Sequence, residues 1–132
     1  MKNLEDLIKS YTGIVIKKKE ECIIKHDNLI KDNRKDEADL EKIKANIYDI
    51  FTTMVTATEK QINNKKILSE EEKYNDFCIS YLKIFDKIPA SWRAKLEKAK
   101  KNNAVIESVI EEVKLSVADE LRNIFKKLME EN

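Results

Sequence analysis

A chain of 132 residues is long enough to bury a hydrophobic core without disulfides or metals, and we expect residues 1–132 to form one domain. Its single glycine and single proline are too few for the turns of a sheet protein, which predicts an all-α fold. The formal net charge of +1 gives no overall field that would attract nucleic acid or an anionic membrane.

Clusters of asparagine and charged residues divide the chain into four blocks of similar length. They are DNRKD at residues 32–36, NNKK at residues 63–66 and KNN at residues 101–103. A helix of about thirty residues is about 45 Å long. Four such amphipathic helices with short polar connections predict an up-and-down antiparallel four-helix bundle.

The first block carries an interrupted apolar stripe at helical spacing. Its members are Leu4, Leu7, Ile8, Tyr11 and Val15, then Cys22, His26, Leu29 and Ile30 after the charged segment 17–21. Lys18 or Lys19 would lie along the packed face, which a lysine tolerates by laying its methylenes on apolar surface. Alternatively, the two ends of this helix pack against different neighbours.

The second block has a more regular stripe. It consists of Leu40, Ile43, Ile47, Ile50, Met54, then Ala57 or Thr58, and Ile62. The segment FTTMVTAT at residues 51–58 is rich in β-branched residues, which favour strands. Its apolar and polar residues do not alternate, so we expect it to be helical.

The third block opens with a capping box, in which Ser69 and Glu72 satisfy each other's backbone N–H groups. Its stripe comprises Tyr74, Phe77 or Cys78, Tyr81, Phe85 and Ile88, and continues past Pro89 through Trp92, Leu96 and Ala99. Pro89 lacks an N–H, so we expect the helix to kink or break there, with a break into two roughly aligned segments favoured. Ser91 could cap the second segment, and Trp92 should be buried.

The fourth block has a single stripe through Ile106, Ile110, Val113, Val117, Leu121, Ile124 and Leu128. Further apolar residues lie beside or opposite the stripes of the first and fourth blocks, namely Ile14, Ile16, Ile23, Ile24, Val109, Leu115 and Phe125. A face this wide predicts a homodimer, with Ile16 and Phe125 in its interface. The alternative is that the first helix rotates and takes Ile23 and Ile24 into the core.

Cys22 and His26 are four residues apart and share a helix face, where they could bind zinc or activate a thiol. Zinc needs three or four protein ligands, and no second Cys or His lies nearby in sequence. A reduced thiol beside a histidine at the stripe edge is therefore favoured, and Cys78 should also be reduced. Gly13 is the only glycine, which excludes a glycine-rich phosphate loop. We expect no catalytic residue, metal or cofactor.

The segment after Pro89 is strongly basic, with five basic residues against the single acid Glu97. Trp92, Arg93, Lys95, Lys98, Lys100 and Lys101 could together hold a nucleic-acid backbone. The fourth block is acidic, however, and an antiparallel hairpin would place it beside this segment. Charge pairing within the fold is the favoured interpretation, and nucleic acid is not the expected partner.

These observations predict a non-catalytic helical interaction module, such as an adaptor, a chaperone-like binder or a small regulator, with a protein partner. The alternatives are a nucleic-acid accessory protein using residues 92–101, and an enzyme or metal site around Cys22 and His26. The start MKNLEDLIKSY is polar where a signal peptide would be apolar, and no apolar run approaches about 20 residues. We expect a cytoplasmic protein without a membrane span, and the abundant Lys, Ile and Asn suggest a bacterial source.

Overall fold

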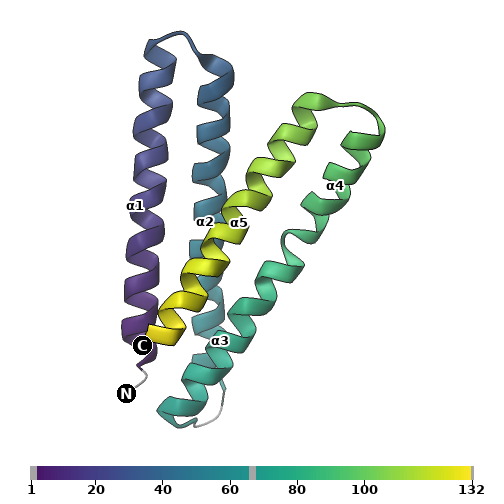
Figure 1. Ribbon diagram of the computed structural model, residues 1–132. Coiled ribbons are helices and arrows are strands. Elements are labelled where there is room, and N and C mark those ends of the chain that lie inside the picture. Colours follow the sequence, from purple (N-terminus) through teal and green to yellow (C-terminus); the bar gives the residue numbers. More distant parts are fainter. Residues whose placement is uncertain (1–2, 66–67, 132) are drawn as a thin grey trace.

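The computed structural model describes residues 3–65 and 68–131, and within them all regular structure is helical (Figure 1). The helices are α1 (Leu4–Lys31), α2 (Lys35–Asn63), α3 (Glu70–Lys87), α4 (Ala90–Lys101) and α5 (Val105–Glu131). α3 and α4 together make the third helix of an up-and-down bundle. The predicted all-α bundle is confirmed, and its third helix is kinked near the proline.

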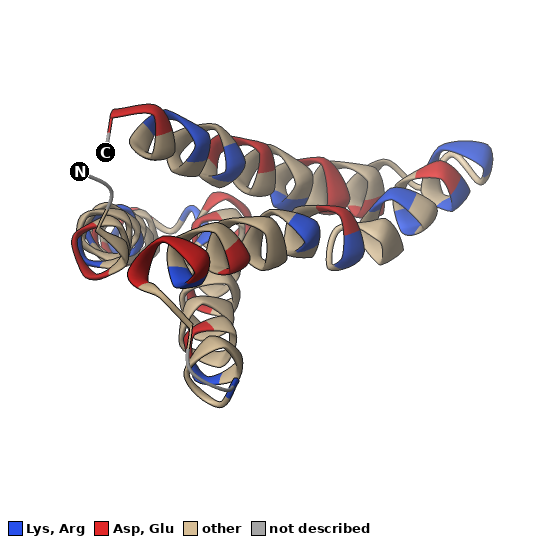
Figure 2. Ribbon diagram, turned by 90° about the horizontal axis from the view of Figure 1, so that it is seen from below, with Lys and Arg blue, Asp and Glu red and all other residues tan. Residues whose placement is uncertain are grey.

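The helices form two hairpins that pack together at one end and diverge at the other. α1 pairs with α2, and the bent α3–α4 pairs with α5 (Figure 1). The hairpins meet near the chain termini and separate toward the α1–α2 and α4–α5 turns. Seen from below, the α3–α4 and α5 ribbons run away from α1, which is viewed nearly end-on (Figure 2). The bundle is therefore closed at the end that holds the termini and open at the other.

Both turns at the open end are built in the same way, around an asparagine with a positive φ. Asn33 has φ 59° and Asn103 has φ 55°, the left-handed conformation that asparagine tolerates better than most residues. The amide of the next residue then reaches back to the last helical turn, from Arg34 to Leu29 O at 2.9 Å and from Ala104 to Ala99 O at 2.8 Å. The first and third predicted boundaries are thus Schellman caps. The second predicted boundary, NNKK at residues 63–66, begins at the last residue of α2. Its residue 66 lies outside the described residues.

An aromatic cluster fills the closed end and joins all four bundle helices. Its rings come from Tyr11 on α1, Phe51 on α2, Phe77, Tyr81 and Phe85 on α3, and Phe125 on α5. Tyr81 is central, with its ring centroid 5.5 Å from that of Tyr11 and 4.9 Å from that of Phe125. Phe51 stacks on Phe85 at 4.7 Å. Rings in offset or edge-on contact add to the stabilisation that burial alone provides.

The burial of Phe125 corrects the expectation that this residue lies off the core and in an exposed interface. Its side chain is fully buried, as is that of Leu121, four residues earlier. The buried face of α5 runs through Val117, Ala118, Leu121 and Phe125, whereas Ile124 and Leu128 lie at its edge. The core face of α5 is therefore rotated from the predicted stripe, because the largest side chain on the helix enters the aromatic cluster.

Two hydroxyl groups inside the cluster satisfy each other. Tyr81 Oη donates to Phe51 O at 3.0 Å, and the hydroxyls of Tyr11 and Tyr81 are 2.9 Å apart. Because the Tyr81 proton is committed to the carbonyl, Tyr11 donates to Tyr81. Burial raises the pKa of both phenols, which keeps them protonated. The pair links α1, α2 and α3 in a region that excludes water.

The third helix bends by 19° at the proline and stays roughly aligned. Ile88 and Pro89 keep right-handed helical φ and ψ, and hydrogen bonds continue on both sides of the bend. Ser91 lies inside α4 and is not its N-cap, a correction to the expected capping role. Trp92 is 7% exposed and meets Phe51 edge-on at 6.5 Å, as its position on the stripe predicts.

α1 serves two environments along its length. Tyr11 and Val15 lie in the shared core, whereas Cys22 is buried further along, near Glu41 of α2. Between them, Lys18 Nζ is 3.7 Å from Glu120 of α5 and Lys19 Nζ is 2.7 Å from Asp49 of α2. Both lysines are half-buried, as expected for side chains along the packed face. Ile23 and Ile24 stay exposed, so the alternative of a rotated first helix was wrong.

Removing the Tyr81 hydroxyl should leave the Tyr11 hydroxyl buried without its acceptor. We expect Tyr81→Phe to lower the free energy of unfolding by about 1–3 kcal/mol, the cost of an unsatisfied buried polar group. Urea unfolding followed by circular dichroism measures this. The double variant Tyr11→Phe/Tyr81→Phe should lose less than the sum of the two single variants. Strictly additive losses would show that the hydroxyls do not interact.

Truncating Trp92 should open a cavity beside Phe51. We expect Trp92→Ala to cost about 3–5 kcal/mol in the free energy of unfolding, as for other large aromatic truncations. Arg93→Ala, at the exposed neighbouring position, is the matched control and should change it by less than about 0.5 kcal/mol. A fully red-shifted tryptophan emission from the native wild-type protein would contradict the burial on which this prediction rests.

Candidate functional site

An apolar groove lies between α2 and α5 at the open end of the bundle. It encloses about 270 Å³ and is lined by Leu40, Ile43, Val105, Ile106, Val109 and Ile110, together with Asp36 and Asp39. Ile106 is 73% exposed although it lies on the predicted stripe. Exposed apolar side chains gathered in one place are unfavourable in water unless something covers them.

The groove exists because two apolar stripes continue beyond the part of the bundle where the hairpins pack. Leu40, Ile43 and Ile47 follow one another at helical spacing on α2, and Ile47 is buried where the first two are half-exposed. On α5, Ile106 and Ile110 precede the buried Val117 in the same way. Both helices thus present the face that packs in the core, but at the open end the hairpins have diverged and the two stripes border a groove (Figure 1).

A polar junction separates the groove from the aromatic cluster. Tyr48 of α2 donates to Glu120 of α5 at 2.6 Å, and Lys18 of α1 pairs with the same carboxylate at 3.7 Å. Burial, together with the Glu120 carboxylate, raises the pKa of Tyr48, so its hydroxyl stays protonated and remains a donor. These contacts join the two hairpins between the groove and the core, and Tyr48 was not singled out by the sequence pattern.

The charges that line the groove are both negative. Asp36 and Asp39 belong to the first two turns of α2, and the other lining side chains are apolar. Acidic residues in the first turn of a helix are favoured by the helix dipole, so Asp36 has a structural role as well. A group that bound in this groove would have to be apolar where it entered, and positive charge at the edge would favour it.

The Cys22–His26 pair has the shared helix face that its spacing predicts, and its thiol is buried. Cys22 is buried and free, and His26 Nδ1 lies 3.1 Å from Asp27 Oδ1. Burial, reinforced by the Glu41 carboxylate, raises the pKa of the Cys22 thiol from 9.0 to about 11. A thiol that stays protonated is a weak nucleophile. Within residues 3–65 and 68–131, no cluster of three or more Cys, His, Asp or Glu could hold a metal ion.

The basic segment is exposed, but its tryptophan is not. Arg93, Lys95, Lys98 and Lys101 face solvent, and Lys100 Nζ lies 3.9 Å from Glu112 of α5. The sequence predicts charge pairing between this segment and the acidic helix. Among the described ion pairs, the one between Lys100 and Glu112 joins them. Trp92 is packed inward and has Lys114 Nζ 5.9 Å from its ring centroid. Trp92 therefore does not contribute to an exposed surface. This corrects the expectation that it forms an interaction surface together with the neighbouring lysines.

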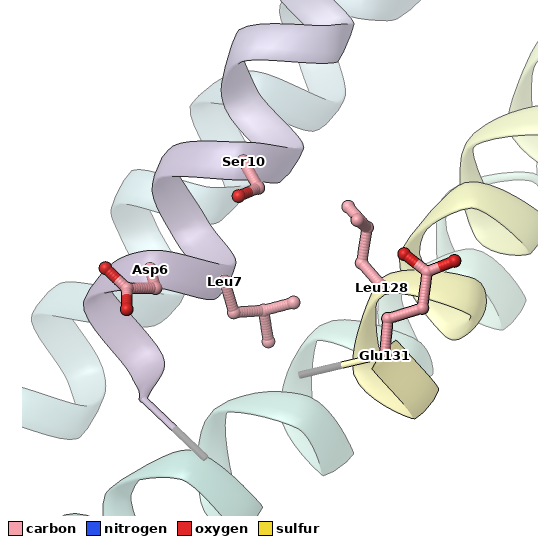
Figure 3. A pocket seen from close by; sticks show the side chains of 5 residues that line it. All are labelled: Asp6, Leu7, Ser10, Leu128 and Glu131. Carbon is pink, nitrogen blue, oxygen red and sulfur yellow. The ribbon is translucent and has the colours of Figure 1, made fainter. Parts of the chain in front are cut away.

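A smaller cavity of about 170 Å³ lies at the closed end, between the first turns of α1 and the last turns of α5 (Figure 3). Leu7 and Leu128 extend toward each other across it, whereas the Asp6 carboxylate points away. Ser10 and Glu131 complete the lining. The polar groups do not converge on one point, as those of a binding or catalytic pocket do, so the α2–α5 groove is the better candidate site.

Comparisons of the chain with protein-family models, with curated proteins and with solved structures found no match. None of the described helices combines the length and the apolar character needed to span a membrane. The candidate site is thus defined by its geometry and chemistry in this chain.

Alkylation of Cys22 tests whether this thiol is buried, because burial raises its pKa. In a Cys78→Ala background, iodoacetamide at pH 8 should modify Cys22 at least about 100-fold more slowly in the native state than in urea, because little thiolate is present. The rate should rise with pH as the thiol ionises toward pH 11. A variant with Cys22→Ala and the exposed Ile24→Cys is the matched control, and should react at nearly the same rate in both states. Rapid native modification of Cys22 would contradict its burial.

Proposed function

We propose that this protein is a non-catalytic, cytoplasmic interaction module that binds an amphipathic helix of a partner protein in the groove between α2 and α5. The observation that carries the proposal is the continuation of two core-forming stripes, through Leu40 and Ile43 and through Ile106 and Ile110, into open space. A partner helix laid there would complete at the open end the bundle that exists at the closed end. Helices commonly bind in apolar grooves by their own i, i+3 and i+4 side chains.

The partner helix should carry lysine or arginine beside its apolar face. Asp36 and Asp39 are the charged residues lining the groove, and opposite charges at the edge of an interface favour association and set its register. The volume of about 270 Å³ lies just below the range of about 300–1,000 Å³ of small-molecule pockets. Its lining is apolar except for the two aspartates, which suits a few side chains inserted from a helix.

The other functions considered have less support. An enzyme or metal site around Cys22 and His26 would need a reactive thiolate or further ligands, and the burial of Cys22 disfavours the thiolate. A nucleic-acid accessory role would depend on residues 93–101 without Trp92, which is buried. Cys22 and Cys78 form no disulfide, which is compatible with a reducing compartment and so supports the cytoplasmic assignment.

A designed helical peptide tests the groove directly. The probe is a fluorescent peptide of about five helical turns with leucines at i, i+3 and i+4 spacing and lysines along both edges. We expect it to bind the wild-type protein, and Ile106→Lys to weaken binding at least about tenfold, since a charge would enter the apolar groove. Fluorescence anisotropy measures both affinities. Ile106 is largely exposed, so the substitution should leave the fold intact.

Two controls distinguish binding in the groove from nonspecific binding of the peptide. Ile79→Lys alters an apolar residue on α3 that is 56% exposed and outside the groove, and it should leave the affinity unchanged. Asp36→Lys/Asp39→Lys should reverse the preference between the lysine peptide and an otherwise identical glutamate peptide. If Ile79→Lys and Ile106→Lys weaken binding equally, or if neither peptide binds, the proposed function is wrong.

A further inference from the structure

α1 carries a second apolar surface, on the side that faces away from the bundle core. Ile16, Ile23 and Ile30 are seven residues apart and are 46%, 43% and 45% exposed. Seven residues make about two helical turns, so the three side chains form one ridge along α1. The ridge lies on a helix at the outside of the bundle and is separate from the α2–α5 groove (Figure 1).

The two edges of this isoleucine ridge carry opposite charges. Lys19 and His26 follow Ile16 and Ile23 by three residues, and Glu20 and Asp27 follow them by four. On a helix, these offsets lie about 60° to one side and about 40° to the other side of the ridge. The ridge therefore has one edge next to α2, which carries Lys19 and His26, and an acidic edge on the opposite side.

A shallow groove runs along the edge of the ridge next to α2, between α1 and α2. It encloses about 240 Å³, and its lining includes Ile23, Ala45 and Lys42. Lys19, His26, Asn46 and Asp49 complete the lining. The ion pair between Lys19 and Asp49 neutralises one lysine, which leaves Lys42 as the unbalanced charge of this edge. The groove has an apolar floor and a net positive charge, and it can receive an apolar ridge that carries acidic residues.

We propose that two copies of this chain associate through α1, with the helices parallel and related by a two-fold axis that runs along them. The isoleucine ridge of each copy then meets that of the other, residue for residue. A two-fold axis parallel to the helices also brings the Glu20–Asp27 edge of one copy against the edge of its partner next to α2, where Lys42 is the unbalanced charge. An antiparallel pair would instead bring each edge against its own copy, with Lys42 near Lys42 and Glu20 near Asp27, so charge favours the parallel arrangement.

A second copy fits this surface better than an unrelated partner because the surface is complementary to itself. The ridge supplies the apolar side chains, the Glu20–Asp27 edge supplies negative charge, and Lys42 supplies the positive charge of the other edge. Isoleucines at seven-residue spacing also supply one of the two apolar positions per heptad at which parallel helices pack their side chains together. Closed two-fold pairs are the commonest assemblies of identical chains.

Light scattering behind a sizing column tests the association. The wild-type protein should have twice the chain mass of 15.5 kDa at high concentration, and Ile23→Lys should return it to one chain mass with unchanged helicity by circular dichroism. Ile79→Lys on α3 and Ile106→Lys in the α2–α5 groove are the matched controls, and both should keep the doubled mass. A wild-type mass of 15.5 kDa at every concentration, or dissociation by Ile106→Lys and not by Ile23→Lys, would overturn the proposal.

Single cysteines distinguish the two orientations of the pair. In a Cys22→Ala/Cys78→Ala background, Ile16→Cys should form a covalent dimer on mild oxidation with diamide, because residue 16 meets itself in a parallel pair. Ile30→Cys should do the same. Cross-linking that occurs only when the two variants are mixed would overturn the parallel arrangement. This proposal stands apart from helix binding in the α2–α5 groove, since each surface is altered by its own variant.

Discussion

The hydroxyl pair of Tyr11 and Tyr81 fixes how the two hairpins are joined. Tyr81 donates to the carbonyl of Phe51 and accepts from Tyr11, so one buried side chain sets the positions of α1, α2 and α3 along one another. Phe125 of α5 contacts both tyrosine rings and brings the fourth helix into the same arrangement. Hydrogen bonds inside an apolar cluster have strict geometry, because a displaced partner would leave a polar group without water or protein. These hydrogen bonds and ring contacts fix the arrangement of the helices at the closed end. That arrangement in turn sets where the helices lie at the open end.

The polar junction above this cluster ends the region where the hairpins pack directly. Glu120 accepts from Tyr48 and pairs with Lys18, so groups from α1, α2 and α5 meet at one carboxylate. The Glu120 side chain is 42% exposed, so this carboxylate keeps part of its hydration at the edge of the contact between the hairpins. Beyond it, the stripes of α2 and α5 are still those of core-forming helices, but they face a groove. The surface available for binding is thus a direct continuation of the surface that drives folding.

Much of the fold could be predicted from local sequence signals, because those signals act over a few residues. The Ser69–Glu72 capping box, the asparagine turns at residues 33 and 103 and the buried stripe through Tyr74, Phe85 and Trp92 all follow from helix chemistry. Periodicity also assigned Leu40, Ile43, Ile106 and Ile110 to inward faces, yet it could not predict that these faces lie too far apart to pack. An apolar stripe shows which side of a helix faces inward. It carries no information on the distance from that side to the neighbouring helix. Phe125 and Tyr48 were missed for a related reason, since the rotation of each helix is decided by partners distant in the sequence.

The divergence of the two hairpins also has a mechanical consequence. From Glu120 to Val105, α5 extends about 22 Å beyond the junction, at about 1.5 Å per residue. A rotation of about 5° at the junction would move the far end of this arm by about 2 Å, roughly the depth of one methyl group. The aromatic cluster would be almost undisturbed, because it lies on the other side of the pivot. A small adjustment near Glu120 would therefore change the width of the α2–α5 groove, and the proposed site would then accept helices of different bulk without repacking of the core.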